Sequence, residues 1–294
     1  MKIDTHQHYW RYQAQDFPWI RDAMPALQRD CGPAAVLPAL QAAGVDAVVA
    51  VQARSSADET DYLLDLAAHN PQIVGVVGWT DLCAPDVGEA LDGYAAQPLL
   101  KGFRHILQDE PDLPALLRRP EFSRGVQALQ QRGLVYDVLV FDHQMSSALD
   151  FCAHHSDHWL VLDHAGKPCI KDWLTRAEVP SRWLASLRAL AAMPHVLCKL
   201  SGLVTEADWA SGHGVLPQDA TTLLECFDRA LELFGPNRIL YGSDWPVCQL
   251  AAPYAVVHGL AERWANSRLT AREQSAFWSD NAVRCYDLKL PTAA

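Results

Sequence analysis

Eight short apolar runs, each followed by a turn and a helical pattern, constrain the fold of this 294-residue chain more than any other feature. Most are continuously apolar rather than alternating, as is typical of parallel strands buried on both faces. The runs are Ile3–His8, Ala47–Ala53, Ile73–Thr80, Leu100–Arg104, Leu134–Val140, Trp159–His164, Val196–Gly202 and Ile239–Asp244. Eight strand–helix alternations predict an α/β fold, a single (β/α)8 TIM barrel over residues 1–294. A doubly wound open sheet is the alternative, but it usually has fewer strands and a Gly-rich first turn, which this sequence lacks.

The segment Tyr9–Gly32 is too long and too aromatic for a simple connection between a strand and a helix. Functional loops of barrels gather at the C-terminal face of the strands. We therefore expect this loop to form a lid or wall over a site, although a hydrophobic cap without a ligand role is an alternative. Farther along the chain, Gly235-Pro236 is a helix stop signal, and Thr270–Glu273 is a capping box that opens a C-terminal helix.

Charge and cysteine content limit the partners of the chain. A formal net charge of −11 argues against nucleic acids and anionic membranes as partners. No apolar run approaches the length of a membrane span, and no basic and apolar leader precedes the first strand. Eight cysteines are scattered without C-x-x-C spacing, which favours a reducing cytoplasm.

Two histidines, His6 and His8, stand two residues apart at the end of the first run. Side chains two apart on a strand project from the same face. Two imidazoles on one face suit a metal ion or the polarisation of one oxygen atom. Taken alone, the pair could equally belong to an exposed edge strand.

Other strands end in residues of matching chemistry. Barrel enzymes keep their active sites at the C-terminal ends of the strands. His164 ends the sixth run and Asp244 ends the eighth, so both could converge with His6 and His8 at the barrel mouth. The carboxylate can act as a general base, and the imidazoles can polarise a carbonyl or hold a metal. The alternatives are that His164 is a core histidine and that Asp244 caps the next helix.

Further residues at the strand ends are candidates for binding a substrate. Arg104 ends the fourth run and can donate paired hydrogen bonds to substrate oxygens, although a surface carboxylate is the commoner partner of Arg. Lys167 follows the sixth run and could instead be solvated. Aromatic side chains would supply apolar walls of a substrate site; they are Trp10, Trp79, Trp209 and Trp245.

Three motifs together resemble the amidohydrolase superfamily. They are His6-x-His8, Asp163–Pro168 (Asp-His-Ala-Gly-Lys-Pro) and Gly242–Pro246 (Gly-Ser-Asp-Trp-Pro). The opening Asp-Thr-His-Gln-His-Tyr-Trp is most similar to the lactonase-type branch that acts on sugar lactones such as L-fuconolactone, to which 2-pyrone-4,6-dicarboxylate lactonase is related. The resemblance implies a hydrolase that opens an L-fucono-lactone-like aldonolactone to the aldonic acid. Asp244 would activate the water, and the three imidazoles would stabilise the oxyanion.

The sequence departs from the binuclear members of this superfamily, which use a carboxylated Lys at the end of the fourth strand and a His at the end of the fifth. Here Lys101 lies near the start of the fourth strand, and His143 lies beyond the fifth. We therefore expect at most one divalent ion, zinc if any, and none that is strictly required. Its ligands would be His6, His8, His164 and Asp244.

The same residues leave other functions open. One is a metal-dependent decarboxylase of the amidohydrolase superfamily, and another is hydrolysis of a carboxylated lactone such as a pyrone dicarboxylate. A third is a barrel that binds a sugar acid without turning it over, but pure binding needs no carboxylate such as Asp244 to activate water. We expect a small-molecule sugar lactone as the partner, and the sequence leaves homo-oligomerisation open.

Overall fold

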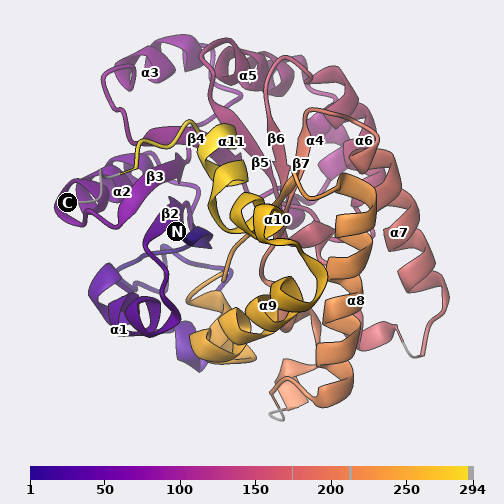
Figure 1. The fold of residues 1–294 in the computed structure, drawn as a ribbon. Coiled ribbons are helices and arrows are strands. Elements are labelled where there is room, and N and C mark those ends of the chain that lie inside the picture. Colours follow the sequence, from indigo (N-terminus) through magenta and orange to yellow (C-terminus); the bar gives the residue numbers. More distant parts are fainter. Residues whose placement is uncertain (174, 212–213, 291–294) are drawn as a thin grey trace.

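Eight parallel strands lie side by side in chain order in the computed structural model, which describes residues 1–173, 175–211 and 214–290 (Figure 1). The strands are β1 (Ile3–Gln7), β2 (Ala47–Val51), β3 (Ile73–Gly78), β4 (Leu100–His105), β5 (Val135–Val138), β6 (Leu160–Leu162), β7 (Val196–Leu200) and β8 (Ile239–Tyr241). Each falls within, or within one residue of, an apolar run of the sequence. The last four residues of the predicted domain, 291–294, lie outside the described residues.

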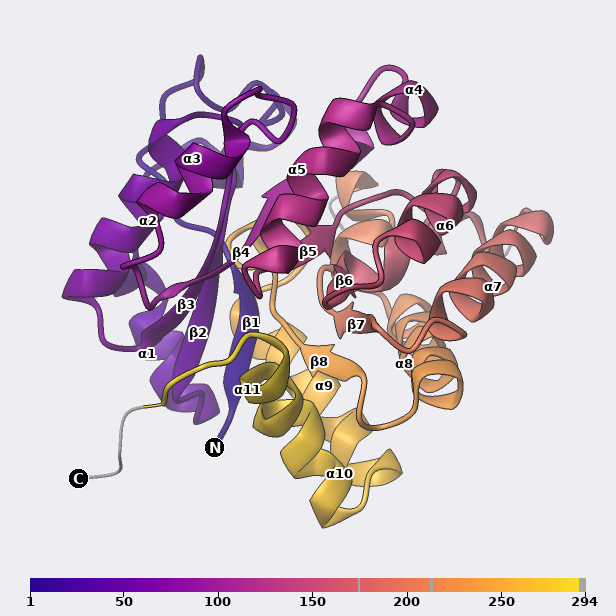
Figure 2. The same cartoon turned by 90° about the horizontal axis from the view of Figure 1, so that it is seen from above.

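Helices surround the strands on the outside, as Figure 2 shows from above. They are α1 (Pro33–Ala43), α2 (Asp58–His69), α3 (Val87–Gly93), α4 (Leu113–Leu117), α5 (Pro120–Gln131), α6 (Met145–His154), α7 (Glu178–Ala191), α8 (Pro217–Phe234), α9 (Tyr254–Arg268), α10 (Ala271–Ser275) and α11 (Asn281–Cys285). The predicted (β/α)8 barrel is confirmed. Helix α8 ends before Gly235, and the capping box predicted at Thr270 opens α10. No described helix is long and apolar enough to cross a membrane.

The first and last strands meet through backbone hydrogen bonds at their C-terminal ends. The Asp244 amide donates to the His6 carbonyl at 2.9 Å, and the His8 amide donates to the Trp245 carbonyl at 2.7 Å. Thr5 Oγ1 adds a bond to the Tyr241 carbonyl at 2.5 Å. The seam between β1 and β8 is therefore held by the segments that carry the predicted catalytic residues.

Alternate strand residues enter two separate apolar clusters, because successive side chains of a strand point to opposite faces. On β2, Val48 and Ala50 pack with the surrounding helices, whereas Val49 and Val51 face the barrel interior. The interior cluster includes residues of the C-terminal segment, among them Tyr286. Helix α11, in front of the strands in Figure 1, thus covers the N-terminal end of the barrel.

The long aromatic loop after β1 packs on itself. Trp10 and Cys31 exchange two backbone hydrogen bonds, each 2.9 Å long, which join the two ends of the loop. Phe17 and Leu27 are buried beneath it. The loop therefore has a small apolar core of its own.

Close backbone packing between α5 and the loop after β3 depends on Gly125. A Cβ atom at this position would lie 2.1 Å from the Leu82 carbonyl oxygen. We predict that Gly125→Ala lowers the free energy of unfolding by about 1–3 kcal/mol, because the helix must move away. Gly88→Ala in α3 is the matched control, since its nearest neighbour would lie 3.7 Å away. Urea unfolding measures both, and equal midpoints for the two variants would contradict this account of the packing.

Candidate active site

Four predicted residues come together at the C-terminal end of the barrel. One carboxylate oxygen, Asp244 Oδ1, lies 3.2 Å from His8 Nε2, 3.8 Å from His6 Nε2 and 4.0 Å from His164 Nε2. The imidazoles of His6 in β1 and His8 just after it point the same way, with 3.2 Å between their Nε2 atoms. All four side chains are at least 95% buried. The Asp244 carboxylate faces imidazoles, so its position does not support the alternative that it caps the next helix.

Unusual backbone conformations aim two of these side chains. His164 has a φ of 54° and Asp244 a φ of 61°, both in the left-handed region that non-glycine residues rarely adopt. Each costs about 1–2 kcal/mol. Neighbouring bonds hold the turns in place, among them that of the Asp244 amide to His6 and one from Trp183 Nε1 to the Ala165 carbonyl at 2.7 Å. Strain of this kind is concentrated at functional sites.

The hydrogen-bond partner of His8 determines which of its nitrogens carries the proton. Nδ1 lies 2.8 Å from the Val51 carbonyl, which can only accept, so the proton of a neutral ring sits on Nδ1. The Nε2 lone pair then faces Asp244 Oδ1, a second acceptor, at 3.2 Å. Two acceptors at this distance repel each other unless a proton or a cation lies between them. His164 is less constrained, because its Nδ1 partner at 2.9 Å is the Ser201 hydroxyl, which can donate or accept.

Burial determines the charge state of the cluster. It lowers the pKa of His164 to about 4 and the pKa of His6 well below its ordinary value, so both rings are neutral at pH 7. Burial alone would raise the pKa of Asp244, but the surrounding imidazoles, His164 foremost, hold that pKa below its ordinary value. At neutral pH the site therefore presents neutral His6 and His164 rings and an ionised Asp244 carboxylate.

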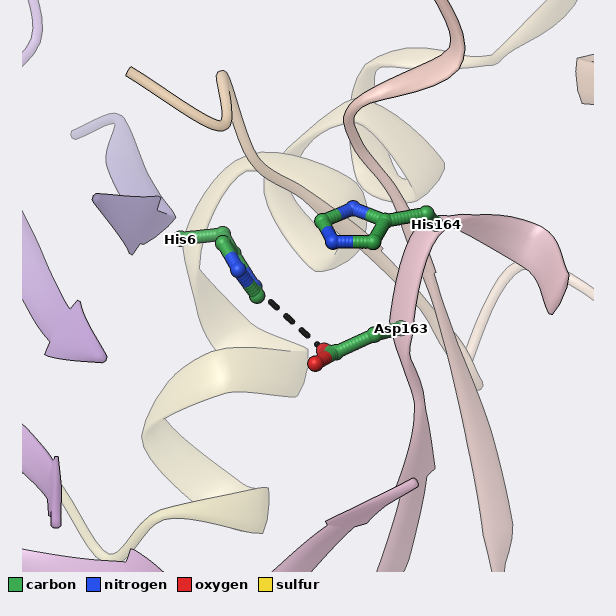
Figure 3. A group of neighbouring side chains, drawn as sticks. All are labelled: His6, Asp163 and His164. Carbon is green, nitrogen blue, oxygen red and sulfur yellow. Dashed lines mark ion pairs between the residues drawn. The ribbon is translucent and has the colours of Figure 1, made fainter. Parts of the chain in front are cut away.

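Beneath these residues lies a buried ionic network that the sequence analysis did not assign to the site. Asp163 Oδ1 lies 3.3 Å from His6 Nδ1, as the dashed line in Figure 3 marks, and 3.2 Å from Lys199 Nζ. Lys199 also binds Asp137 on β5. Burial raises the pKa of Asp163, but Lys199, His6 and Arg104 together outweigh it and hold that pKa well below its ordinary value. The sequence signal that could have revealed this network was Lys199, a charged residue at an inward position of an otherwise apolar strand.

Arg104 belongs to this network. Its guanidinium donates to Gln52 Oε1 at 2.9 Å, to the Gln52 carbonyl at 2.6 Å and to Asp163 Oδ2 at 3.0 Å. Its Nη1 also lies 3.2 Å from His6 Nε2. We predicted that Arg104 binds substrate oxygens, whereas its N–H groups face acceptors within the protein. A direct contact with substrate stays a prediction.

The predicted aromatic walls differ in their exposure. Trp10 and Trp245 are buried, and the Trp10 indole donates to the Arg29 carbonyl inside the aromatic loop. Trp79 is only partly buried, and its indole nitrogen lacks a hydrogen-bond partner among the described residues. Contacts of these rings with a substrate stay predictions.

Lys167 lies at the rim of the site. Its ammonium donates to Gln108 Oε1 at 3.0 Å and lies 3.8 Å from Glu206 Oε1. The lysine and histidine nearest in sequence to the ligand positions of a binuclear centre lie elsewhere. Lys101 binds the Asp287 carbonyl near the C-terminal segment, and the His143 side chain is 62% exposed.

The donor set of the cluster fits one divalent ion. Zinc at its usual distance of about 2.0–2.1 Å from each ligand would separate neighbouring tetrahedral donors by about 3.3 Å. Two separations, from His8 Nε2 to His6 Nε2 and to Asp244 Oδ1, are 3.2 Å. A cation there would also resolve the contact between two acceptors. His6, Asp163 and His164 form a second group with metal-ligand chemistry.

Comparison with known proteins agrees with this geometry. A family model described as amidohydrolase matches residues 3–288. The chain belongs to the amidohydrolase family. The resemblance inferred from its three motifs is thus confirmed over nearly the whole length of the chain.

Relatives of this amidohydrolase include proteins named as lactonases. An L-fucono-1,5-lactonase from Burkholderia multivorans is 51% identical and is aligned over 100% of this chain and 98% of its own. Another from Burkholderia ambifaria is 32% identical over 99% of this chain and 97% of its own. A crystal structure of a Burkholderia multivorans amidohydrolase with bound zinc superposes with a TM-score of 0.94, at 51% identity, over 98% of this chain and 100% of that one.

Gly202 lies directly against two residues of the cluster. It has a φ of 63°, and a Cβ atom there would lie 2.5 Å from His164 Nδ1 and 2.9 Å from Asp244 Oδ2. We predict that Gly202→Ala lowers kcat for an aldonolactone about 100-fold, because small displacements of catalytic groups cost that much. Gly44→Ala is the control: its φ of 65° imposes the same backbone penalty with no neighbour within 4 Å. Equal kcat values for the two variants would contradict the prediction.

Arg104 offers a test of the ionic network. We predict that Arg104→Met lowers the free energy of unfolding by about 3–5 kcal/mol, because Asp163 keeps its buried charge and loses a partner. Arg229→Met makes the same chemical change at a half-exposed ion pair with Glu232 and should have little effect. Chemical denaturation at pH 7 compares them. Similar stabilities would show that Arg104 is not needed to balance the buried charge.

Proposed function

We propose that this amidohydrolase hydrolyses L-fucono-1,5-lactone, or a closely related aldonolactone, to the aldonic acid. The observation that carries the proposal is the full-length identity of 51% to an L-fucono-1,5-lactonase. The cluster at the barrel mouth supports it, since it places a carboxylate among imidazoles. A carboxylate can activate the water and an imidazole can stabilise the oxyanion in the hydrolysis of a carboxylic ester.

Asp244 is the general base of the proposed mechanism. Its low pKa keeps it ionised, and it takes a proton from water as the water oxygen bonds to the lactone carbonyl carbon. The carbonyl electrons move to oxygen, and collapse of the tetrahedral intermediate breaks the ring C–O bond. The proton on Asp244 then passes to the ring alkoxide. A weak base suffices because the lactone carbonyl is electrophilic and its leaving group is tethered.

The imidazoles have different roles. His164 can carry its proton on Nε2 when Ser201 donates to Nδ1, and it then donates to the developing oxyanion. His8 cannot do so as a neutral ring, because its proton is held by Val51. As a neutral ring, His8 therefore does not act as a direct oxyanion donor, although all three histidines were expected to stabilise the oxyanion. A divalent ion bound by His6, His8 and Asp244 would polarise the carbonyl, and zinc is the ion whose ligand preferences match these donors best.

Surrounding residues position the catalytic groups and the substrate. Arg104 and Asp163 hold the His6 ring, and we propose Lys167 and Trp79 as substrate contacts. Eight free cysteines, six of them buried, are consistent with the proposed cytoplasmic location. The oligomeric state stays a prediction from sequence. Hydrolysis of a carboxylated lactone and decarboxylation of an aromatic acid are the competing reactions, and release of CO₂ would identify the latter.

Two measurements test the mechanism. With a pH indicator that detects the released acid, we predict that L-fucono-1,5-lactone is hydrolysed and that Asp244→Asn lowers kcat by about 10²–10⁴-fold at unchanged fold. Chelated protein, with metal content checked by mass spectrometry, should keep most of the activity.

Other results would change this assignment. A substrate left intact by wild-type protein would reject the lactonase, and an active Asp244→Asn variant would reject the base. Activity that follows metal content stoichiometrically would make His6 and His8 obligate metal ligands.

A further inference from the structure

A cavity of about 310 Å³ is lined by segments that follow His164 and Gly202 in the chain. One wall is Lys167, three residues beyond His164, and another is the segment from Thr205 to Ala210. That segment is tied to Gly202, whose carbonyl accepts from Thr205 Oγ1 at 2.7 Å. Because Gly202 borders both His164 and Asp244, this segment connects the cavity wall to the catalytic cluster along the chain. Its volume suits a small ligand.

Two opposite charges face each other in this cavity. Lys167 Nζ and Glu206 Oε1 are 3.8 Å apart, and their side chains are 15% and 13% exposed. Lys167 is held from behind, by Gln108 Oε1 at 3.0 Å and by the Phe141 ring, whose centroid is 4.9 Å away. The distance of 3.8 Å is longer than a hydrogen bond, so a ligand group can bridge the two charges.

A sugar hydroxyl has the chemistry to make this bridge. One hydroxyl group can accept a hydrogen bond from an ammonium and donate one to a carboxylate at the same time. Two adjacent hydroxyl groups can divide these roles, one bonding to each charged group. Trp209 also lines the cavity and offers an apolar face to the carbon side of a ring. An alkyl lactone without hydroxyl groups could make none of the polar contacts.

A substrate carboxylate suits the cavity less well. It would compete with Glu206 for Lys167 and lie beside a like charge. Burial raises the pKa of Glu206; Lys167 and Lys171 oppose that rise, while the negative charges of Asp244 and Asp142 add to it. An anion bound beside Glu206 would add to this repulsion.

We propose that Lys167 and Glu206 form the subsite that recognises ring hydroxyl groups and selects neutral polyhydroxylated lactones over carboxylated or unsubstituted ones. This proposal rests on the proposed lactonase function and adds the determinant of its specificity. The carbonyl of the substrate would lie at the His–Asp cluster, and its hydroxyl groups would extend toward the 141–143, 167 and 205–209 segments.

The test is a ratio of two substrates with the same ring. L-Fucono-1,5-lactone carries hydroxyl groups and one methyl group, whereas δ-valerolactone carries neither. Because Lys167 and Glu206 are polar, a change in the ratio of the two kcat/KM values in their variants reports on the hydroxyl groups. Glu206→Gln and Lys167→Met should each lower that ratio by about 10–100-fold, the usual value of a hydrogen bond to a charged group. Lys171→Met is the matched control, because Lys171 lines the same cavity but is exposed. Its ratio should change less than twofold.

The outcomes separate the subsite from the lactonase. A ratio that stays within twofold in the Glu206 and Lys167 variants overturns the subsite, whether both rates are kept or both fall together. If wild-type protein leaves L-fucono-1,5-lactone intact, the proposed function fails, and saturation-transfer NMR with the neutral polyol L-fucitol tests the subsite instead. A signal lost in Glu206→Gln and kept in Lys171→Met supports the subsite, and no signal with wild-type protein rejects it.

Discussion

The ammonium group of Lys199 is the interaction on which the interior of this barrel depends. It is fully buried, so its charge is stable only because Asp137 and Asp163 contact it. Burial lowers the pKa of Lys199, but the two carboxylates outweigh this and raise it. Asp137 also accepts from Tyr286 of the segment that covers the N-terminal end of the barrel, and Asp163 contacts His6 at the opposite end. One chain of contacts therefore joins the closed end of the barrel to its catalytic end.

The charges along this chain of contacts do not cancel completely. Of the buried carboxylates around it, Asp4 is held by uncharged donors, whereas Asp137, Asp163 and Asp244 share two cations, Lys199 and Arg104. The excess negative charge falls at Asp244, because the other two carboxylates have cationic partners within 3.2 Å. Asp244 Oδ1 also faces the lone pair of His8 Nε2. The site thus has a place for one positive charge, which either a proton or a metal ion can supply.

Much of the fold and part of the site followed from sequence, for identifiable reasons. Continuous apolar runs gave the strands, and chemistry at the strand ends gave His6, His8, His164 and Asp244. Asp163 and Lys199 were missed because a charged residue in an apolar run has no visible partner until the strands are paired. The internal partners of Arg104 were missed for the same reason: its acceptor Gln52 is 52 residues away. The sixth strand is shorter than the Trp159–His164 run, since the left-handed backbone of His164 ends it.

Backbone hydrogen bonding, rather than side-chain packing alone, fixes the catalytic geometry. Asp244 and His6 belong to the last and first strand segments, and the amide of one donates to the carbonyl of the other at 2.9 Å. The His8 amide is held to Trp245 in the same way at 2.7 Å. A base and two imidazoles placed by adjacent backbones need little reorganisation during reaction, which is the basis of electrostatic preorganisation. The contacts that close the barrel also set the distance between base and imidazole, so barrel closure and catalytic geometry depend on the same hydrogen bonds.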